Sequence, residues 1–283
     1  MGVVIGRMDG QVEKIFLGNN LTRRGKTAYP SSREEKTGRG YHFMKISVAM
    51  AYYNGGTYIE EQMDSILSQL GNQDEVIVSV DGASDGSEPI LLNMEKKDCR
   101  IQVIKGPGKG VVKNFENAIR HCTGDIIYLS DQDDIWKPDK VKKVNAAFDN
   151  LEVKAILHDA EITDENGKAT GAESLFALRK SKPGILKNLI KNSYVGCCMA
   201  FRKELIPVIC PIPKEMYMHD YWIGTAADYM GQVCFLKDKL IGYRRHSSNV
   251  TQMTHGSIDF MVKKRIDIIR CLGLLKKRVR EIG

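Results

Sequence analysis

Three aspartates stand within four consecutive residues near the middle of the chain, at Asp131, Asp133 and Asp134. Neighbouring carboxylates repel one another, so a fold keeps such a cluster most readily where a divalent cation or a helix N-terminus offsets the charge. Two carboxylates separated by one residue can ligate Mg²⁺ or Mn²⁺ while the ion keeps open positions for a diphosphate. An isolated Asp-x-Asp is more often an acidic turn or a helix cap. The surrounding elements must therefore decide whether these residues form a metal site.

The segments around this cluster alternate between strand and helix patterns. The predicted strands cover residues 45–51, 75–80, 100–104 and 125–130, and the predicted helices cover 57–70, 88–97 and 111–122. Repeated strand–helix–strand order predicts an α/β fold with a mostly parallel central sheet. In such sheets ligands bind beyond the carboxyl ends of the strands. The aspartate cluster follows the fourth predicted strand directly, which favours a binding site over a plain turn.

Taken together, the motifs resemble glycosyltransferase family 2, and within it the rhamnosyltransferase-like enzymes of bacterial surface-polysaccharide synthesis. The resemblance extends from Met44 to about Thr251. It rests on the order and spacing of Val48–Gly55, Asp81–Ser87, Lys109–Phe115, Ser130–Trp136, Gly196–Phe201, His219–Asp220 and Tyr243–His246. It implies the GT-A fold, which is a Rossmann-like fold of nucleotide-diphospho-sugar transferases. It also implies a donor, dTDP-rhamnose or a UDP-hexose, and a saccharide or lipid-linked acceptor.

The resemblance assigns the metal site to residues from two distant parts of the chain. Asp133 would be a direct ligand of Mn²⁺ or Mg²⁺, and Asp131, a further candidate ligand, would lie nearer the donor ribose or sugar. Asp134 would support the donor sugar. His246 would return to the same ion from late in the chain, since imidazole is an acceptable ligand for Mn²⁺.

The same resemblance places further donor-binding residues on the loops that follow the other strands. Val80 and Ala83 depart from the usual residues of the acidic loop that faces the nucleotide base, so the choice of base stays open. Arg244 is an additional candidate for holding diphosphate charge. The implied donor-binding residues are Tyr53, Asn54, Asp81, Asp85, Lys109, Asn114 and Arg245.

Asp220 is the candidate general base of an inverting transfer. It begins a helical pattern that runs to Met230, where a carboxylate is either a helix cap or a base. Inversion at a sugar carbon needs a base within hydrogen-bond reach of the acceptor hydroxyl, and Asp220 matches the family's position. His219 beside it is expected either to support Asp220 or to pack.

The chain is predicted to have three parts. Residues 1–43 are rich in Gly, Asn, Ser and basic residues and are expected to be poorly ordered, with Met44 as the natural start. Residues 44–256 form the predicted GT-A catalytic domain, and 257–283 a basic amphipathic helix. That helix would either lie on an anionic membrane or pack on the domain or on a partner subunit.

Charge and cysteine content limit the remaining function classes. The net charge is +7, but the two terminal parts carry +4 and +5, which leaves −2 for the middle and argues against nucleic-acid binding. Seven cysteines without Cys-x-x-Cys spacing indicate reduced thiols, and no apolar run is long enough for a membrane span. The expected location is the cytoplasm, peripheral to the inner face of the membrane. A nucleotidyltransferase and a catalytically silent sugar-nucleotide-binding module remain alternatives.

Overall fold

The computed structural model of the chain describes residues 34–37, 40–246 and 258–282. Contacts divide the chain into two units, Met1–Pro30 and Ser31–Gly283. The first unit lies outside the described residues, as does most of the predicted N-terminal extension. Within that extension, the described residues form a small antiparallel pair of strands, β1 (Glu34–Thr37) and β2 (Gly40–Phe43).

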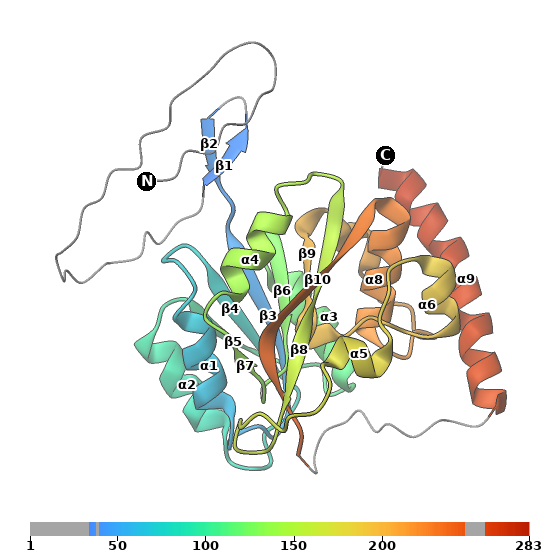
Figure 1. The fold of residues 1–283 in the computed structure, drawn as a ribbon. Coiled ribbons are helices and arrows are strands. Elements are labelled where there is room, and N and C mark those ends of the chain that lie inside the picture. Colours follow the sequence, from blue (N-terminus) through green and yellow to red (C-terminus); the bar gives the residue numbers. More distant parts are fainter. Residues whose placement is uncertain (1–33, 38–39, 247–257, 283) are drawn as a thin grey trace, which may run out of the picture. The chain divides into compact units, whose positions relative to one another are not determined.

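Eight strands form one sheet in the second unit, in the order β5-β4-β3-β6-β9-β8-β10-β7 (Figure 1). Strands β3 to β6 are mutually parallel, β9 is antiparallel to both β6 and β8, β8 and β10 are parallel, and β7 is antiparallel to β10. The predicted α/β fold with a mostly parallel sheet is therefore confirmed. The strands are β3 (Ile46–Tyr52), β4 (Glu75–Val80), β5 (Ile101–Lys105), β6 (Ile126–Ser130), β7 (Ile135–Trp136), β8 (Val153–Thr163), β9 (Met199–Arg202) and β10 (Gln232–Arg244).

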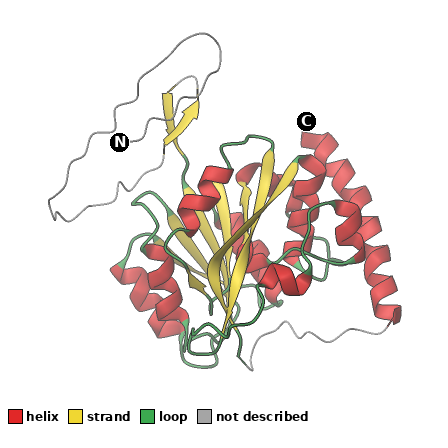
Figure 2. Ribbon diagram, in the orientation of Figure 1, coloured by secondary structure: helices red, strands yellow, loops and turns green. Residues whose placement is uncertain are grey.

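Helices cover both faces of this sheet (Figure 2), because its central strands are apolar on both sides. Val48 and Met50 of β3 pack with helices α1, α2 and α4, whereas Ala49 between them packs with α3, α7, α8 and α9. This alternation is the side-chain period of a strand. The helices are α1 (Ile59–Leu67), α2 (Glu88–Lys97), α3 (Val111–His121), α4 (Lys140–Ala147), α5 (Leu175–Arg179), α6 (Ile185–Ile190), α7 (Ile206–Ile209), α8 (His219–Met230) and α9 (Ile258–Ile282), with 3₁₀ turns η1 (Gly196–Cys198) and η2 (Lys203–Leu205).

Beyond shifts of one residue at element ends, the local structure differs from the predictions in three places. Helix α1 begins at Ile59 rather than at residue 57, because the backbone N–H groups of Tyr58 and Ile59 both bond to the Gly55 carbonyl in a tight turn. The motif Gly196–Phe201, whose apolar pattern also predicts a strand, begins instead as the turn η1. Helix α8 is capped by Met218, so the reading of Asp220 as its N-cap is wrong.

Helix α9 packs on the rest of the second unit through one apolar face. Its residues Ile268, Cys271 and Leu275 are buried in the same core cluster as Trp222. The Arg278 guanidinium donates to the carbonyls of Val208 and Pro211, at 2.7 and 2.8 Å. The structure thus supports packing on the domain for this face of the helix. None of the described helices is long and apolar enough to cross a membrane.

Shortening a side chain to alanine should affect stability differently on the two faces of α9. Leu275 is 0% exposed and Ile269 is 56% exposed. We expect Leu275→Ala to lower the free energy of unfolding by about 2–5 kcal/mol, because it leaves a cavity. The matched variant Ile269→Ala should change it by less than about 0.5 kcal/mol. Urea unfolding of both variants measures this, and equal effects would contradict the packing of α9 described here.

Candidate active site

The candidate residues converge because the strands that precede them run parallel. The carboxyl ends of β3, β4, β6, β8 and β10 meet at one edge of the sheet and carry the loops that contain Asn54, Asp81, Asp131 and His246. Strand β9 is antiparallel, so its beginning lies at this same edge. Ala200 of β9 pairs with Tyr128 of β6. When this antiparallel register is extended by three residues, Cys197 lies opposite Asp131.

Asp133 and His246 are brought together from positions 113 residues apart in the sequence. The Asp133 Oδ2 and His246 Nε2 atoms are 2.8 Å apart, and their side chains are 16% and 9% exposed. The Tyr58 ring lies beside the imidazole, with 5.0 Å between ring centroids. A carboxylate oxygen and an imidazole nitrogen that lie this close together are ligand atoms that suit Mn²⁺. The predicted pair therefore fits a metal ion geometrically.

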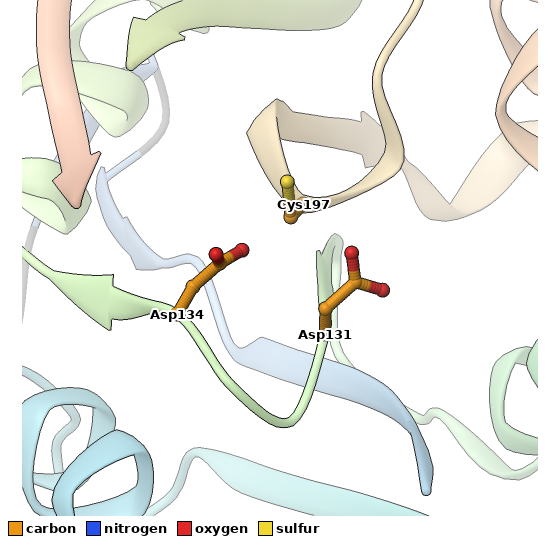
Figure 3. A group of neighbouring side chains, drawn as sticks. All are labelled: Asp131, Asp134 and Cys197. Atoms are coloured by element: carbon orange, nitrogen blue, oxygen red, sulfur yellow. The ribbon is translucent and has the colours of Figure 1, made fainter. Parts of the chain in front are cut away.

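A second group of side chains adjoins this pair. Asp131, Asp134 and Cys197 each offer a ligand atom, and the three atoms lie within 4.8 Å of one another. Figure 3 shows the two carboxylates of the acidic loop facing the Cys197 thiol. The sequence indicated only a reduced thiol at Cys197, whereas here the side chain forms one wall of the carboxylate group.

Asp134 is almost completely buried, and only one of its two carboxylate oxygens has a hydrogen-bond partner among the described residues. Its Oδ1 atom accepts a hydrogen bond from the Arg244 backbone N–H at 3.1 Å, and its Oδ2 atom has no partner among the described residues. Burial, followed by the charges of Asp133 and Asp131, raises the pKa of Asp134. Burial and the Asp133 charge likewise raise the pKa of Asp131. Such clustered acids gain from a positively charged or hydrogen-bonding ligand, as the sequence analysis expected.

Arg244 is a structural residue rather than a free diphosphate-binding cation. Its guanidinium is buried and donates to the carbonyls of Asp133 and Glu165 and to the Glu61 carboxylate, at 2.7, 2.6 and 2.6 Å. It also lies over the Tyr58 ring. With its side chain 2% exposed and three of its donors engaged within the protein, Arg244 holds the acidic loop in place, which corrects the expectation that it binds diphosphate.

Gln132, which was not among the predicted site residues, also ties the acidic loop to the residue that follows β3. The Gln132 side-chain amide accepts from the Tyr53 N–H at 2.6 Å and donates to the Tyr53 carbonyl at 2.7 Å. A Cβ on Gly55 would come within 2.5 Å of the Gln132 side chain. The Tyr53 side chain itself is 60% exposed, so it is available to a ligand.

Asp81 and Asp85 shape the loops beside this edge through bonds to backbone N–H groups. The Asp81 carboxylate accepts from Gly108 and from Gly110, the latter at 2.8 Å, and so joins the loop after β4 to the loop before α3. Asp85 accepts from the Gly56 N–H at 3.0 Å. Burial by itself would raise the pKa of Asp85. Hydrogen bonds from the Ser87 side chain and from the Gly56 and Ser87 backbone N–H groups stabilise the charged carboxylate, and the pKa is lowered as a result. Both carboxylates therefore hold the backbone of these loops in place.

The other predicted donor-binding residues are divided between buried and exposed positions. Asn114 is buried, and its amide nitrogen donates to the carbonyls of Tyr52 and Ser79, so it links α3 to two strands. Asn54 adopts a positive φ of 49° and bonds to the Ser84 hydroxyl. Lys109 is exposed, and Arg245 is half-buried beside His246.

Asp220 lies in the first turn of α8 and is buried. Its Oδ2 atom accepts from the Gly196 N–H at 3.2 Å, and its Oδ1 atom accepts from the Tyr221 N–H at 2.6 Å. Burial raises the pKa of Asp220 to about 6. A carboxylate whose pKa lies nearer to neutrality is a better general base than an ordinary aspartate.

His219 packs and does not orient Asp220. Its ring stacks on Phe115 with 3.8 Å between centroids, and neither ring nitrogen has a hydrogen-bond partner among the described residues. Burial lowers the pKa of His219 to about 3, so the ring is neutral. Of the two roles that the sequence left open, the structure favours packing.

Lys140 is a buried side chain of this region that no sequence motif indicated. Its Nζ atom donates to the Cys197 carbonyl at 3.1 Å and lies 3.9 Å from the centroid of the Trp136 ring. Lysine at a helix start is usually solvated, so its type alone predicts exposure. The available signal was its spacing, because Lys140 shares a helix face with the buried residues Val141 and Val144.

Comparison with protein families gives one extended match. The profile described as Glycosyl transferase family 2 matches residues 47–209, which is more than half of the chain. That range contains the acidic loop, the turn η1 and the loops of β3 and β4, whereas Asp220 and His246 lie beyond it.

Curated relatives match at moderate identity. An uncharacterized glycosyltransferase of Nostoc sp. is 26% identical over 215 residues, which cover 73% of this chain and 66% of that protein. The dTDP-rhamnosyl transferase RfbG of Shigella flexneri is 26% identical over 239 residues, which cover 78% of this chain and 79% of RfbG. The chain spans slightly less than two thirds of the length of the Nostoc relative.

Solved structures share the fold. The S. aureus protein TarS, residues 1–349 in complex with UDP-GlcNAc, superimposes with a TM-score of 0.61 at 18% identity, over 80% of this chain and 66% of TarS. The mannosyltransferase PcManGT of Pyrobaculum calidifontis, in complex with GDP-Man and Mn²⁺, gives 0.52 at 19% identity over 70% of this chain and 56% of PcManGT. These likenesses confirm the expected GT-A fold.

Proposed function

Because the chain belongs to glycosyltransferase family 2, we propose that it is an inverting, metal-dependent transferase that moves a sugar from a nucleoside diphosphate donor to an acceptor hydroxyl. The observation that carries the proposal is the 2.8 Å pairing of Asp133 with His246 at the sheet edge that also holds Asp220. Direct displacement of the nucleoside diphosphate by the acceptor needs metal ligands and a base at the same edge of the sheet.

Asp133 and His246 are the proposed metal ligands, with Asp131 of the same loop as the third candidate. A divalent cation held there would neutralise charge on the departing nucleoside diphosphate. Arg244 keeps the Asp133 carbonyl and the Asp134 carboxylate fixed. Preorganised groups of this kind need no rearrangement during the reaction, and that lowers the barrier.

Asp220 is the proposed base. Bonds from the Gly196 and Tyr221 N–H groups hold its carboxylate in one orientation. In the proposed reaction its oxygen takes the proton of the acceptor hydroxyl while the hydroxyl oxygen attacks the anomeric carbon. The bond from that carbon to the diphosphate breaks on the opposite face, and the configuration is inverted.

Tyr53, Asn54, Lys109 and Arg245 are proposed to contact the donor, and Asp81, Asp85 and Asn114 to set the shape of its pocket. The donors we propose are dTDP-rhamnose, as the name of RfbG supports, or a UDP-hexose, as the UDP-GlcNAc complex of TarS supports. The proposed acceptor is a saccharide or lipid-linked saccharide of a cell-surface polysaccharide.

The proposal can be tested by measuring nucleoside diphosphate release. Purified protein with Mn²⁺ would be incubated with dTDP-rhamnose, UDP-glucose, UDP-GlcNAc or GDP-mannose and a panel of octyl glycosides and bacterial lipid extracts. One donor should be consumed in an acceptor-dependent way, with a product of inverted anomeric configuration. Binding of a donor without transfer would favour the silent module, and release of pyrophosphate from a nucleoside triphosphate would favour a nucleotidyltransferase.

The rate should fall on the acid side of the pH profile. Burial raises the pKa of Asp220 to about 6, and only the ionised carboxylate can accept a proton. We therefore expect kcat/KM to be level above neutral pH and to fall about tenfold per pH unit well below pH 6. The profile would be measured at saturating Mn²⁺, so that loss of metal does not mimic the effect. A level profile down to pH 5 would contradict this role.

We also propose that the outward face of α9 contacts an anionic membrane surface. Arg270, Lys276, Lys277 and Arg280 are exposed along it, beside Ile269. Each basic residue near such a surface contributes about 1 kcal/mol of attraction. The triple variant Lys276→Glu/Lys277→Glu/Arg280→Glu should bind phosphatidylglycerol vesicles at least about tenfold more weakly in a sedimentation assay. Equal binding of the unchanged protein to neutral phosphatidylcholine vesicles would refute the idea.

A further inference from the structure

The turn η1 (Gly196–Cys198) touches both halves of the proposed site. On one side, the Cys197 sulfur lies within 4.8 Å of carboxylate oxygens of Asp131 and Asp134 (Figure 3). On the other side, the Gly196 N–H donates to the Asp220 carboxylate at 3.2 Å. A shift of this one turn would therefore change the metal-side carboxylates and the base together.

The turn has little freedom where it meets α8. A Cβ built on Gly196 would lie 2.7 Å from the Nε2 atom of His219 and 3.7 Å from the Asp220 Cβ. His219 in turn stacks on Phe115 of α3, so it cannot easily retreat. Glycine at this position lets the backbone come close enough for its N–H to reach Asp220.

Lys140 holds the opposite side of the same turn. Its Nζ atom donates to the Cys197 carbonyl at 3.1 Å and lies over the Trp136 ring, which belongs to β7. The lysine is 0% exposed. Because β7 pairs with β10, the contact fastens η1 to the part of the sheet that leads to His246.

The charge of Lys140 is not used in an ordinary ion pair. Among the residues that the structure describes, no carboxylate lies within 4.0 Å of its Nζ atom. Burial lowers the pKa of Lys140 to about 8, although the Cys198 and Cys197 thiols and the Asp134 and Asp131 carboxylates act in the opposite direction. A buried ammonium without a paired carboxylate is costly for stability. Its place beside the acidic loop suggests a role in function.

We propose that Lys140 is a positioning residue of the transfer reaction, which holds η1 through the Cys197 carbonyl and supplies fixed positive charge beside the acidic loop. Through η1 it would set the distance between the donor sugar and the Asp220 base. The inference rests on the proposed function, because it concerns the same site.

The test compares Lys140→Met, which removes the hydrogen bond and the charge, with Lys140→Arg, which keeps both. Lys143→Met is the matched control, since Lys143 lies on the same helix but is exposed and pairs with Asp238. The readouts are kcat and KM in the nucleoside diphosphate release assay, and the affinity for Mn²⁺ with UDP or dTDP by calorimetry. The affinity measurement separates positioning from loss of the metal site.

We expect Lys140→Met to lower kcat by about 10- to 100-fold, because a displacement of about 1 Å at a reacting group has an effect of this size. Its affinity for the metal and nucleoside diphosphate should stay within about threefold, since residues elsewhere bind them. Lys140→Arg should recover at least about tenfold of the lost rate, and Lys143→Met should match the unchanged protein.

A folded Lys140→Met variant with unchanged kcat would overturn the inference, and so would a loss of rate matched by an equal loss of nucleotide affinity. If Lys140→Met does not fold, the test compares kcat of Lys140→Gln, which removes the charge, with kcat of Lys140→Arg, which keeps it. Equal kcat for these two variants would show that the charge is dispensable and would overturn the inference. Absence of transfer by the unchanged protein would instead refute the proposed function itself, so the two failures are distinguishable.

Discussion

Replacement of Asp220 by asparagine is expected to lower kcat by about 10²- to 10⁴-fold while donor affinity stays nearly unchanged. The amide keeps the size of the side chain and can still accept the Gly196 hydrogen bond, but it cannot take a proton from the acceptor. General base catalysis typically contributes a factor of this size. The measurement is the steady-state rate of nucleoside diphosphate release, together with calorimetric affinity for the donor.

The control for this variant is Asp228→Asn on the same helix. Asp228 is a half-buried carboxylate that accepts hydrogen bonds from the Tyr194 hydroxyl and the Gly184 N–H. Its substitution should lower stability and leave kcat within about twofold, since the residue lies outside the proposed site. If Asp220→Asn retained full activity, Asp220 would not be the base and the silent-module alternative would gain support.

Replacement of Asp133 by alanine is expected to remove the metal dependence. His246 would lose the carboxylate that lies 2.8 Å from it, and His246 and Asp131 without Asp133 would hold Mn²⁺ weakly. We expect kcat/KM to fall by about 10²-fold or more, because a bound cation contributes several kcal/mol to stabilising the leaving group. The rate would be measured as a function of Mn²⁺ concentration.

Asp139→Asn serves as the control, because Asp139 is an exposed carboxylate six residues further on, at the start of α4. It should show the same Mn²⁺ activation curve as the unchanged protein. If Asp133→Ala kept a normal activation curve, the ion would belong to another group, and Asp131, Asp134 and Cys197 would be the first to test.

The parallel half of the fold was predictable because its strands are nearly continuous apolar runs between strong helix patterns. The segments 75–80 and 88–97 were located correctly to the residue. The second half was less predictable. Strand β9 has only four residues and begins after the turn η1, and β10 shifts register on β8 near Lys239. Long-range pairing determines such elements, and no local pattern encodes it.

The acidic loop, Asp220 and His246 were singled out from motif order, and the structure brings Asp133 and His246 together. The roles of Arg244 and Lys140 could not be read from the sequence, because the type of a basic side chain does not show that it is buried, and for Lys140 only its helical spacing hinted at burial. Arg244 is buried by contacts with Glu61 and Glu165, from parts of the chain far from it. Lys140 is covered by Trp136 and η1. In both cases distant segments create the environment that defines the role.

The most direct test of the central claim is calorimetry of the purified protein with UDP, dTDP and GDP and their sugar conjugates, in Mn²⁺ and then in chelator. We predict micromolar binding of one nucleotide class in Mn²⁺, with a loss of at least about tenfold in chelator, because an ion held by Asp133 and His246 would neutralise the charge of the diphosphate. Binding of none of these compounds in either condition would contradict the assignment of a nucleotide-sugar site to this sheet edge.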